Sequence, residues 1–404
     1  MKTPSSERSR IVFVGRRNAG KSSLVNRFLG QDLSIVSDTP GTTTDPVKKA
    51  MELLPYGPVT LVDAAGVDDE GELGERRVTK TVKEIAAADL VVYVFDASQP
   101  PDNHDHRYLD YLDRIETPVL CVLNKSDLGV SDELRAFLAD RSPRPVEVSC
   151  LAGEGVETLK EATIRAIPRE DPRPLLGDLI GQGDAVVFVV PIDLGAPKGR
   201  LIMPQVASIR ETLDEDAIAI VAKDKELRAA LALLAAPPKL VVTDSQAVMR
   251  VVADVPESIP MTTFSILMAR YKGELEQFVR GLRRIGELQN GDRVLIAEAC
   301  SHHAQEDDIG RVKIPRWLKA FTKKSLEFSH AQGRDFPDDL SEFKLVAHCG
   351  SCTLTRREMK ARLKQVEFAG VPIVNYGVLI SHLHGATPRA LEPFGEARRV
   401  FEEL

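Results

Sequence analysis

Short apolar runs recur along the first 165 residues. Residues 10–14 (RIVFV), 59–63 (VTLVD), 90–96 (LVVYVFD) and 118–123 (PVLCVL) have the length of strands, and residues 75–88 between two of them have helical composition. Continuous apolar runs are typical of strands buried on both faces. Their alternation with helical segments predicts a parallel sheet covered by helices on both faces.

The remainder of the chain repeats this alternation after a segment rich in Pro and charge, residues 168–175, which we interpret as a linker. Strands are predicted at 185–192, 239–243, 293–298, 343–347 and 372–380, and helices at 224–235 and 264–285. A chain of 404 residues is too long for one core. The predicted fold class is therefore α/β, with three domains at residues 1–168, 176–260 and 261–404.

Composition and charge argue against several classes of protein. The net charge of −7 argues against a broad nucleic-acid-binding surface, because phosphate backbones require clustered Lys and Arg. No run approaches 18 consecutive apolar residues, so we expect no membrane span. The first ten residues, MKTPSSERSR, lack the apolar core of a secretory signal. Five cysteines without such a signal suggest a reducing, cytoplasmic location, where paired thiols more often bind metal than form disulfides.

The segment GRRNAGKS, residues 15–22, matches the phosphate-binding pattern G-x-x-x-x-G-K-[ST] between a predicted strand and a predicted helix. Its glycines let successive N–H groups face phosphate oxygens, and the helix adds the positive end of its dipole. Lys21 would neutralise the β- and γ-phosphates, and Ser22 would hold Mg²⁺. An ordinary glycine turn is the alternative. The residues assigned to this loop are Gly15, Asn18, Ala19, Gly20, Lys21, Ser22 and Ser23.

Two further elements follow predicted strands. Asp63 could hold the Mg²⁺ shell, and the N–H of Gly66 could sense the γ-phosphate. In the run Asn124-Lys125-Ser126-Asp127, the Asp127 carboxylate can accept two hydrogen bonds from guanine, whereas adenine would leave it unpaired. At these distances from the phosphate loop, the elements together predict a site that selects GTP over ATP.

These parts resemble the Era and TrmE branch of the translation-factor-like GTPases. The run PGTTTD (residues 40–45) is similar to that branch's switch I, which implies Thr43 as a Mg²⁺ ligand. Asn18 occupies the position that helps hold K⁺ in potassium-activated members, although it could simply brace the loop. Val67 stands where many GTPases carry a water-positioning Gln, so a bound K⁺ could supply that charge. Ser149-Cys150 replaces the usual Ser-Ala beside the base, a mild departure. Glu70 and Glu72 are weak candidates for orienting water.

A second constellation lies near the C-terminus. Cys300-Ser301-His302 follows one predicted strand, and His348-Cys349-Gly350-Ser351-Cys352 follows another. If these strands are parallel neighbours, three thiolates and two imidazoles converge at one edge of a sheet. Such a sulfur-rich set favours zinc or an iron–sulfur cluster over Mg²⁺ or Ca²⁺. A structural zinc site and unliganded core cysteines remain alternatives. Asn375-Tyr376-Gly377 could border the site, although a loop explains it nearly as well.

The GTPase motifs, a middle block, and the runs LIAEACSHH and HCGSC together resemble the HydF family of FeFe-hydrogenase maturation GTPases along the whole chain. This resemblance implies a 4Fe-4S cluster held by Cys300, Cys349 and Cys352, with His302 or His348 near the exchangeable fourth position. It also implies a homodimer formed by the middle domain. The implied cargo is a diiron subcluster precursor, received from two radical-SAM maturases and delivered to the FeFe-hydrogenase apo-enzyme.

Two other functions are compatible with parts of this sequence. A ribosome-assembly or tRNA-modification GTPase with a structural zinc domain should carry a basic block with interleaved aromatics, but the chain is acidic and has one Trp. A signalling GTPase without metal chemistry would leave the five-residue Cys and His pattern unexplained. In the scaffold hypothesis, GTP biases contacts between domains, because a ligand shifts an equilibrium only by its differential affinity.

Overall fold

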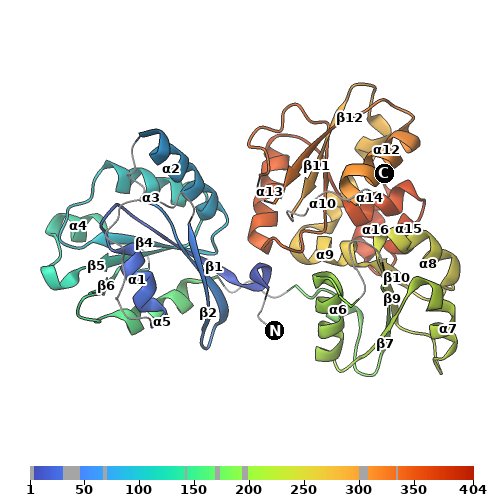
Figure 1. Cartoon of the computed structure of the whole chain (residues 1–404), viewed down its shortest axis with the longest axis horizontal. Coiled ribbons are helices and arrows are strands. Elements are labelled where there is room, and N and C mark those ends of the chain that lie inside the picture. The colour runs from blue at the N-terminus through green and yellow to red at the C-terminus, as the bar shows by residue number, and fades with distance from the viewer. Residues whose placement is uncertain are drawn as a thin grey trace. The chain divides into compact units, whose positions relative to one another are not determined.

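The computed structural model describes residues 4–30, 46–66, 71–141, 143–168, 173–192, 199–299, 308–333 and 335–404. The chain divides into two compact units, Met1–Asp171 and Pro172–Leu404 (Figure 1). No helix in these described ranges combines the length and the apolar composition that crossing a bilayer requires.

The first unit is built on a six-stranded sheet in the order β2-β3-β1-β4-β5-β6. Every neighbouring pair is parallel except β2 with β3, so the predicted mostly parallel sheet is confirmed. The strands are β1 (Ser9–Val14), β2 (Val47–Leu53), β3 (Gly57–Asp63), β4 (Leu90–Asp96), β5 (Val119–Asn124) and β6 (Val146–Val148). The helices are α1 (Lys21–Phe28), α2 (Gly71–Ala86), α3 (Asn103–Arg114), α4 (Asp132–Phe137) and α5 (Val156–Ala166).

Alternation along the strands gives this unit two apolar layers. Within β1, Ile11 and Phe13 belong to one buried cluster, and Val12 and Val14 belong to another. Successive side chains of a strand point to opposite faces, so the two clusters lie on opposite sides of the sheet. Each cluster is completed by helices, and the carboxyl ends of the strands are left for the loops that carry the nucleotide motifs.

The second unit contains two four-stranded sheets, in which all pairings are parallel. The first has the order β10-β9-β7-β8, and its strands are β7 (Ala185–Val189), β8 (Ile218–Ala222), β9 (Leu240–Thr243) and β10 (Met261–Thr263). Its helices are α6 (Met203–Asp214), α7 (Leu227–Ala232) and α8 (Val248–Asp254). Because β10 pairs with β9, Met261–Thr263 belongs with the middle sheet, whereas the prediction begins the third domain at residue 261.

The second sheet has the order β12-β11-β13-β14, formed by β11 (Arg293–Glu298), β12 (Glu327–Gln332), β13 (Leu345–His348) and β14 (Ile373–Asn375). Its helices are α9 (Phe264–Lys272), α10 (Leu275–Arg280), α11 (Arg283–Glu287), α12 (Ile314–Thr322), α13 (Arg356–Phe368), α14 (Tyr376–Leu383), α15 (Thr387–Ala390) and α16 (Gly395–Glu402). The strand predicted over 372–380 is therefore wrong beyond Asn375. The Asn375 side chain caps α14 by accepting from the Gly377 amide, and an apolar run alone does not distinguish a buried strand from a buried helix.

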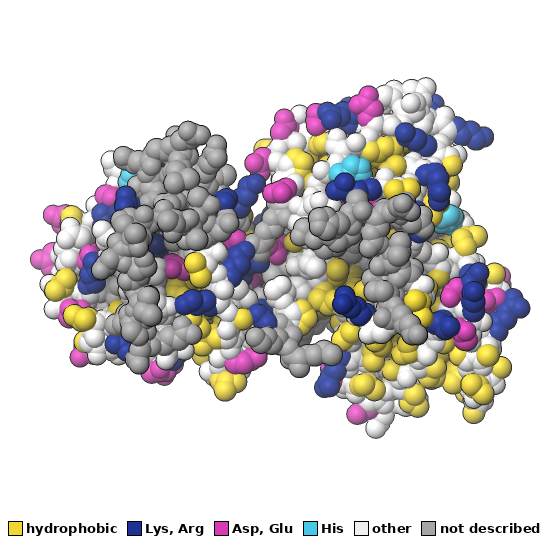
Figure 2. Space-filling model, viewed as in Figure 1, with side chains coloured by type: hydrophobic (Ala, Val, Ile, Leu, Met, Phe, Trp, Pro, Cys, Tyr) yellow, Lys and Arg dark blue, Asp and Glu magenta, His cyan; other side chains and the backbone are white. Residues whose placement is uncertain are grey.

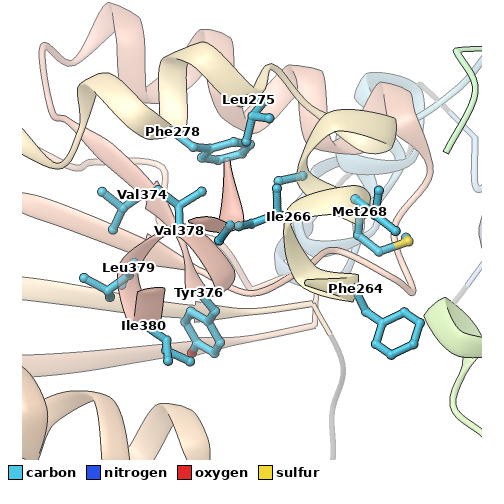
Figure 3. Packing of buried hydrophobic residues seen from close by; sticks show 14 of the residues in the cluster. Phe264, Ile266, Met268, Leu275, Phe278, Val374, Tyr376, Val378, Leu379 and Ile380 are labelled. Atoms are coloured by element: carbon cyan, nitrogen blue, oxygen red, sulfur yellow. The ribbon is translucent and has the colours of Figure 1, made fainter. Parts of the chain in front are cut away.

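One continuous apolar core joins both sheets of this unit, from Leu175 to Ala397. Figure 3 shows side chains of α9, α10 and α14 packed within this core. Phe264, Ile266, Phe278 and Leu379 point toward neighbouring elements. The middle and C-terminal blocks therefore pack as a single unit, because residues of α9 are buried against both.

Candidate functional site

The phosphate loop connects β1 to α1 and depends on its glycines. Gly15 has φ +145°, and a Cβ there would lie 2.1 Å from the carbonyl oxygen of Val94. Gly20 has φ +86°, and a Cβ there would lie 2.2 Å from Nδ2 of Asn124. Both positions combine left-handed backbone with a close approach that only glycine permits. The loop therefore lies tightly against the ends of β4 and β5.

Lys21 lies across this loop. Its side chain is buried, and its Nζ donates to the carbonyl oxygens of Gly15 (3.0 Å) and Arg16 (2.8 Å). Asn18 adopts the left-handed conformation with φ 59°, and Ala19 is buried with its carbonyl accepting from Asn124 Nδ2 at 2.8 Å. The loop thus has the compact conformation expected of a phosphate cradle. Ser22 and Ser23 follow in the first turn of α1.

Asp63 ends β3 beside the phosphate loop, in register with Phe13. Its carboxylate accepts a hydrogen bond from the Ser22 hydroxyl, and the cations of Lys21 and Lys49 act on it. Burial raises the pKa of Asp63 above its ordinary value, and these three neighbours partly offset that rise. A carboxylate and a hydroxyl in contact beside a lysine can hold a hydrated divalent cation. Gly66 lies three residues beyond Asp63.

Thr43, Val67 and Glu70 lie outside the described residues, and the side chain of Glu72 does so as well.

The predicted base-reading residues lie together at the ends of β5 and β6. Asp127 Oδ1 accepts from the Ser149 hydroxyl at 2.6 Å, which orients its carboxylate. Lys125 has φ 61°, and its Nζ pairs with Asp96 at 2.6 Å. The pair with Lys125 holds the pKa of Asp96 below its ordinary value against the opposing effect of burial. Sequence reasoning missed Asp96, although its place as the last residue of β4 is a usable signal.

Cys150 and Asn124 complete this side of the site. The Cys150 amide donates to Asn124 Oδ1 at 3.4 Å, and the Cys150 carbonyl accepts from Arg27 Nε at 3.1 Å. The thiol is buried, and burial raises its pKa to about 11. Cys150 therefore contributes through its backbone and small size, as the alanine of the usual Ser-Ala pair would.

The C-terminal cysteines follow β13, which pairs in parallel with β11, so the predicted neighbouring strands are confirmed. Cys349 and Cys352 are half-buried against the apolar core. The amide of Ala299, which directly precedes Cys300, donates to Cys349 Sγ at 3.0 Å. The Thr353 hydroxyl donates to the Ala299 carbonyl at 2.8 Å. The chain entering Cys300 is thus fixed against the loop that carries both other cysteines.

The thiol of Cys352 lies within electrostatic reach of a buried cation. Burial raises the pKa of Cys352, while the Lys272 ammonium on α9 acts in the opposite direction. A cation near a cysteine favours the thiolate over the thiol, and the thiolate is the form that can bind metals.

His348 is fully buried on β13 with both ring nitrogens engaged. Its Nε2 lies 2.8 Å from Nη1 of Arg362, which can only donate, so the ring is neutral and carries its proton on Nδ1. Nδ1 then donates to the Cys349 carbonyl at 2.9 Å. Burial and the Arg362 charge lower the pKa of His348 to about 3. This arrangement supports the loop from behind rather than presenting a free nitrogen.

Asn375 forms a second support that the sequence only suggested. Its Nδ2 donates to the Cys349 carbonyl at 3.4 Å, and its Oδ1 accepts from Ser265 Oγ at 3.1 Å and from the Gly377 amide at 2.7 Å. A Cβ at Gly377 would lie 2.8 Å from that of Ser265. Sequence reasoning missed Ser265, which follows β10 and has no local motif.

Among residues in the described ranges, no three His, Cys, Asp or Glu side chains gather closely enough to hold a metal ion. Cys300 and His302 lie outside those ranges.

Three protein-family models match separate parts of the chain. The Hydrogen maturase F dimerization domain matches residues 175–273, and the Hydrogen maturase F tetramerization domain matches residues 276–393. The 50S ribosome-binding GTPase model matches residues 10–125. The two maturase models together cover more than half of the chain.

Similar sequences agree with the GTPase match. The tRNA modification GTPase MnmE of Thermotoga petrophila is 40% identical over 162 residues, which are 39% of this chain and 35% of that protein. GTPase Der of Rhodopseudomonas palustris is 36% identical over 168 residues, 40% of this chain and 35% of that protein. The chain thus spans about a third of the length of these relatives. A structure of Aquifex aeolicus Era covers 56% of this chain and 98% of its own, with 20% identity and a TM-score of 0.36.

Proposed function

The chain belongs to the hydrogen maturase F family, and from this premise we propose that it is a GTP-hydrolysing scaffold for FeFe-hydrogenase maturation. In this proposal it carries a 4Fe-4S cluster and delivers a diiron subcluster precursor to the apo-enzyme, after receiving it from two radical-SAM maturases. The family matches over residues 175–393 favour this function over a tRNA-modification or ribosome-assembly GTPase with a zinc domain.

The contact between Ala299 and Cys349 carries the cluster part of the proposal. An amide donor 3.0 Å from a cysteine sulfur is the environment that stabilises a metal-bound thiolate, and such hydrogen bonds tune iron–sulfur clusters. The same residue is the last before Cys300, which supports a shared site for Cys300, Cys349 and Cys352. Three thiolates suit an iron–sulfur cluster with one exchangeable position. His348 would act indirectly, because both of its nitrogens already have partners.

The cluster assignment is tested by anaerobic purification with iron and zinc analysis. We expect a brown protein with about four irons per chain, and iron loss in Cys349→Ser. The matched control is Cys121→Ala, which removes a thiol buried in the GTPase sheet. A colourless protein with one zinc per chain, or unchanged iron content in Cys349→Ser, would refute the assignment.

In the GTPase domain, Lys21 is proposed to bind the β- and γ-phosphates, with Ser22 and Thr43 ligating Mg²⁺ and Asp63 holding its water shell. Asp127 would read guanine, positioned by Ser149. We expect Lys21→Ala to abolish GTP hydrolysis but to leave the iron content intact. Loss of both properties would contradict independent folding of the two units.

Potassium activation is proposed from Asn18, whose left-handed backbone lies in the phosphate loop. With Val67 in place of a Gln, K⁺ would supply positive charge in the transition state. We expect hydrolysis to be at least about tenfold faster in K⁺ than in Na⁺, a difference of about 1.4 kcal/mol in the barrier. Equal rates in the two salts would reject this role for Asn18.

Dimerisation is proposed to use the free edge of the middle sheet. Strand β8 is an edge strand, and Ile218 and Val221 on it are 54% and 48% exposed. Hydrophobic side chains also gather over α6, β7 and α7 in the lower right of Figure 2. An exposed apolar edge strand is a template for pairing with a second copy. We expect Ile218→Lys to yield monomers or weaker dimers by light scattering. The control is Leu54→Lys, which changes a 78% exposed apolar side chain in the first unit.

Delivery is tested directly with the apo-hydrogenase. Protein loaded in the presence of both radical-SAM maturases should activate the apo-enzyme for hydrogen evolution, and Cys349→Ser protein should not. Activation by the cysteine variant at the wild-type level would refute the carrier role.

A further inference from the structure

The second residue of the phosphate loop, Arg16, is anchored outside that loop by three contacts. Its Nη1 lies 3.1 Å from Asp102 Oδ2, its Nε lies 3.3 Å from Asp105 Oδ2, and its Nη2 donates to the Pro100 carbonyl at 3.0 Å. All three acceptors lie in the connection from β4 to α3 or in the first turn of that helix. The guanidinium therefore ties the loop to a separate part of the fold.

Asp105 is the buried end of this connection, with no exposed surface. Its Oδ1 accepts from the Tyr93 hydroxyl at 2.9 Å, and its Oδ2 accepts from the Asp102 amide at 3.0 Å. Burial raises the pKa of Asp105, while its donors and Arg16 act against that rise. These contacts leave the carboxylate little freedom to move, because Tyr93 itself is held in the core of β4.

Stability alone does not account for such an arrangement. A buried ion pair often contributes no more to folding than an apolar pair of similar volume, since the desolvation penalty offsets the attraction. What the pair does supply is a fixed position with directional hydrogen bonds. The loop is pinned elsewhere by Asn124, which donates to the Ala19 carbonyl. Between these two anchors, the Arg16 carbonyl accepts from Lys21.

We propose that Arg16, Asp105 and Tyr93 act as a loop clamp, a set of positioning residues that holds the phosphate loop in its binding conformation before nucleotide arrives. A pre-formed loop has less conformational freedom to lose on binding, so the clamp increases affinity for the diphosphate and triphosphate alike. An interaction that acts equally on the bound substrate and on the transition state changes KM and not kcat. The clamp therefore governs nucleotide retention and leaves the rate of hydrolysis at saturation nearly unchanged.

The proposal rests on GTP hydrolysis by this domain and is independent of the metal cluster. The test uses the full chain with a fluorescent GDP analogue, measured by stopped flow, and with steady-state GTP hydrolysis. We expect Arg16→Gln to release GDP about tenfold faster and to raise KM about tenfold, as for the loss of one charge-assisted hydrogen bond. We expect its kcat to stay within about twofold of wild type.

A double-mutant cycle separates positioning from general destabilisation. Asp105→Asn should weaken GDP binding about tenfold, and adding Arg16→Gln should weaken it less than about threefold further, since both remove one connection. Tyr93→Phe, which keeps the core ring, should give a smaller change of about two- to fourfold and serves if Asp105→Asn fails to fold. The control is Asp113→Asn, on the same helix α3 as Asp105. This substitution breaks an exposed bidentate pair between Asp113 and Arg141.

Each outcome decides the proposal. Wild-type protein that binds no guanine nucleotide would reject the proposed function itself. If wild type binds GDP but Arg16→Gln releases it at the wild-type rate, the clamp is refuted. A fall in kcat at unchanged KM would also refute it, because that result would assign Arg16 to the chemical step. If Asp113→Asn and Arg16→Gln had equal effects on GDP release, the effect of Arg16→Gln would be general destabilisation, and the positioning role would be refuted.

Discussion

The two glycines at the ends of α1 allow a sharp test of how the phosphate loop is packed. Both have left-handed backbone, with φ +86° at Gly20 and +71° at Gly30. A Cβ at Gly20 would lie 2.2 Å from Asn124 Nδ2, whereas a Cβ at Gly30 would meet no atom of the described residues within 4 Å. Alanine at each position thus carries the same backbone strain, but only one substitution forces a neighbour to move.

The magnitudes follow from these contacts. Left-handed backbone costs a non-glycine residue about 1–2 kcal/mol, which is the whole effect expected for Gly30→Ala. Gly20→Ala must also displace Asn124, which is 1% exposed and donates to the Ala19 carbonyl at 2.8 Å. Losing a buried hydrogen bond adds about 1–3 kcal/mol. The free energy of unfolding of the first unit should therefore fall by about 2–5 kcal/mol in Gly20→Ala.

Urea unfolding followed by two probes can separate this difference from changes in the second unit. The chain has one tryptophan, Trp317, which lies in the second unit, so its fluorescence reports that unit while circular dichroism reports both. We expect the fluorescence transition to coincide with wild type in both variants. If Gly20→Ala and Gly30→Ala lower the free energy of unfolding equally, within about 0.5 kcal/mol, the argument from close packing is wrong. GDP affinity should fall at least tenfold in Gly20→Ala only.

Three other predictions concern buried groups. Because burial raises the pKa of Asp63, the stability of the nucleotide-free first unit should fall as the pH rises through that pKa. Asp63→Asn should flatten this pH dependence in urea titrations and should abolish Mg²⁺-dependent hydrolysis. Gly377→Ala, with its Cβ 2.9 Å from Thr263 Oγ1, should destabilise the second unit by about 1–3 kcal/mol, seen as an earlier Trp fluorescence transition; an unshifted midpoint would contradict the packing. Cys121 and Cys150, with pKa values raised by burial to about 12 and about 11, should react with iodoacetamide at pH 8 at least about a hundredfold more slowly than free cysteine, and rapid labelling detected by mass spectrometry would contradict their burial.

The nucleotide side of the molecule could be predicted from short stretches of sequence. The loop at residues 15–22 and the run at 124–127 each encode their geometry within a few consecutive residues, because glycine, lysine and carboxylate positions are set by local backbone conformation. The buried strands β1, β4 and β11 were also found almost to the residue, since continuous apolar runs mark strands covered on both faces.

Edge strands and the end of the last sheet were less predictable. Strand β2 is half-exposed and was missed because it lacks a continuous apolar run, whereas β8 was missed although its five residues, IAIVA, are all apolar. The apolar pattern after Asn375 predicts a strand, although this segment forms α14. Its apolar residues are compatible with either structure, and the choice depends on packing against α9 and on the Asn375 cap.

The sequence alone determined which chemical groups this protein carries and the local backbone that presents the phosphate loop, because those depend on residues adjacent in the chain. Tertiary structure alone decided which of these groups support one another. Ser265 reaches Asn375 across 110 residues, and Arg16 reaches Asp102 across 86. Such contacts follow from how sheets and helices pack, and packing is a property of the whole core that no single segment encodes.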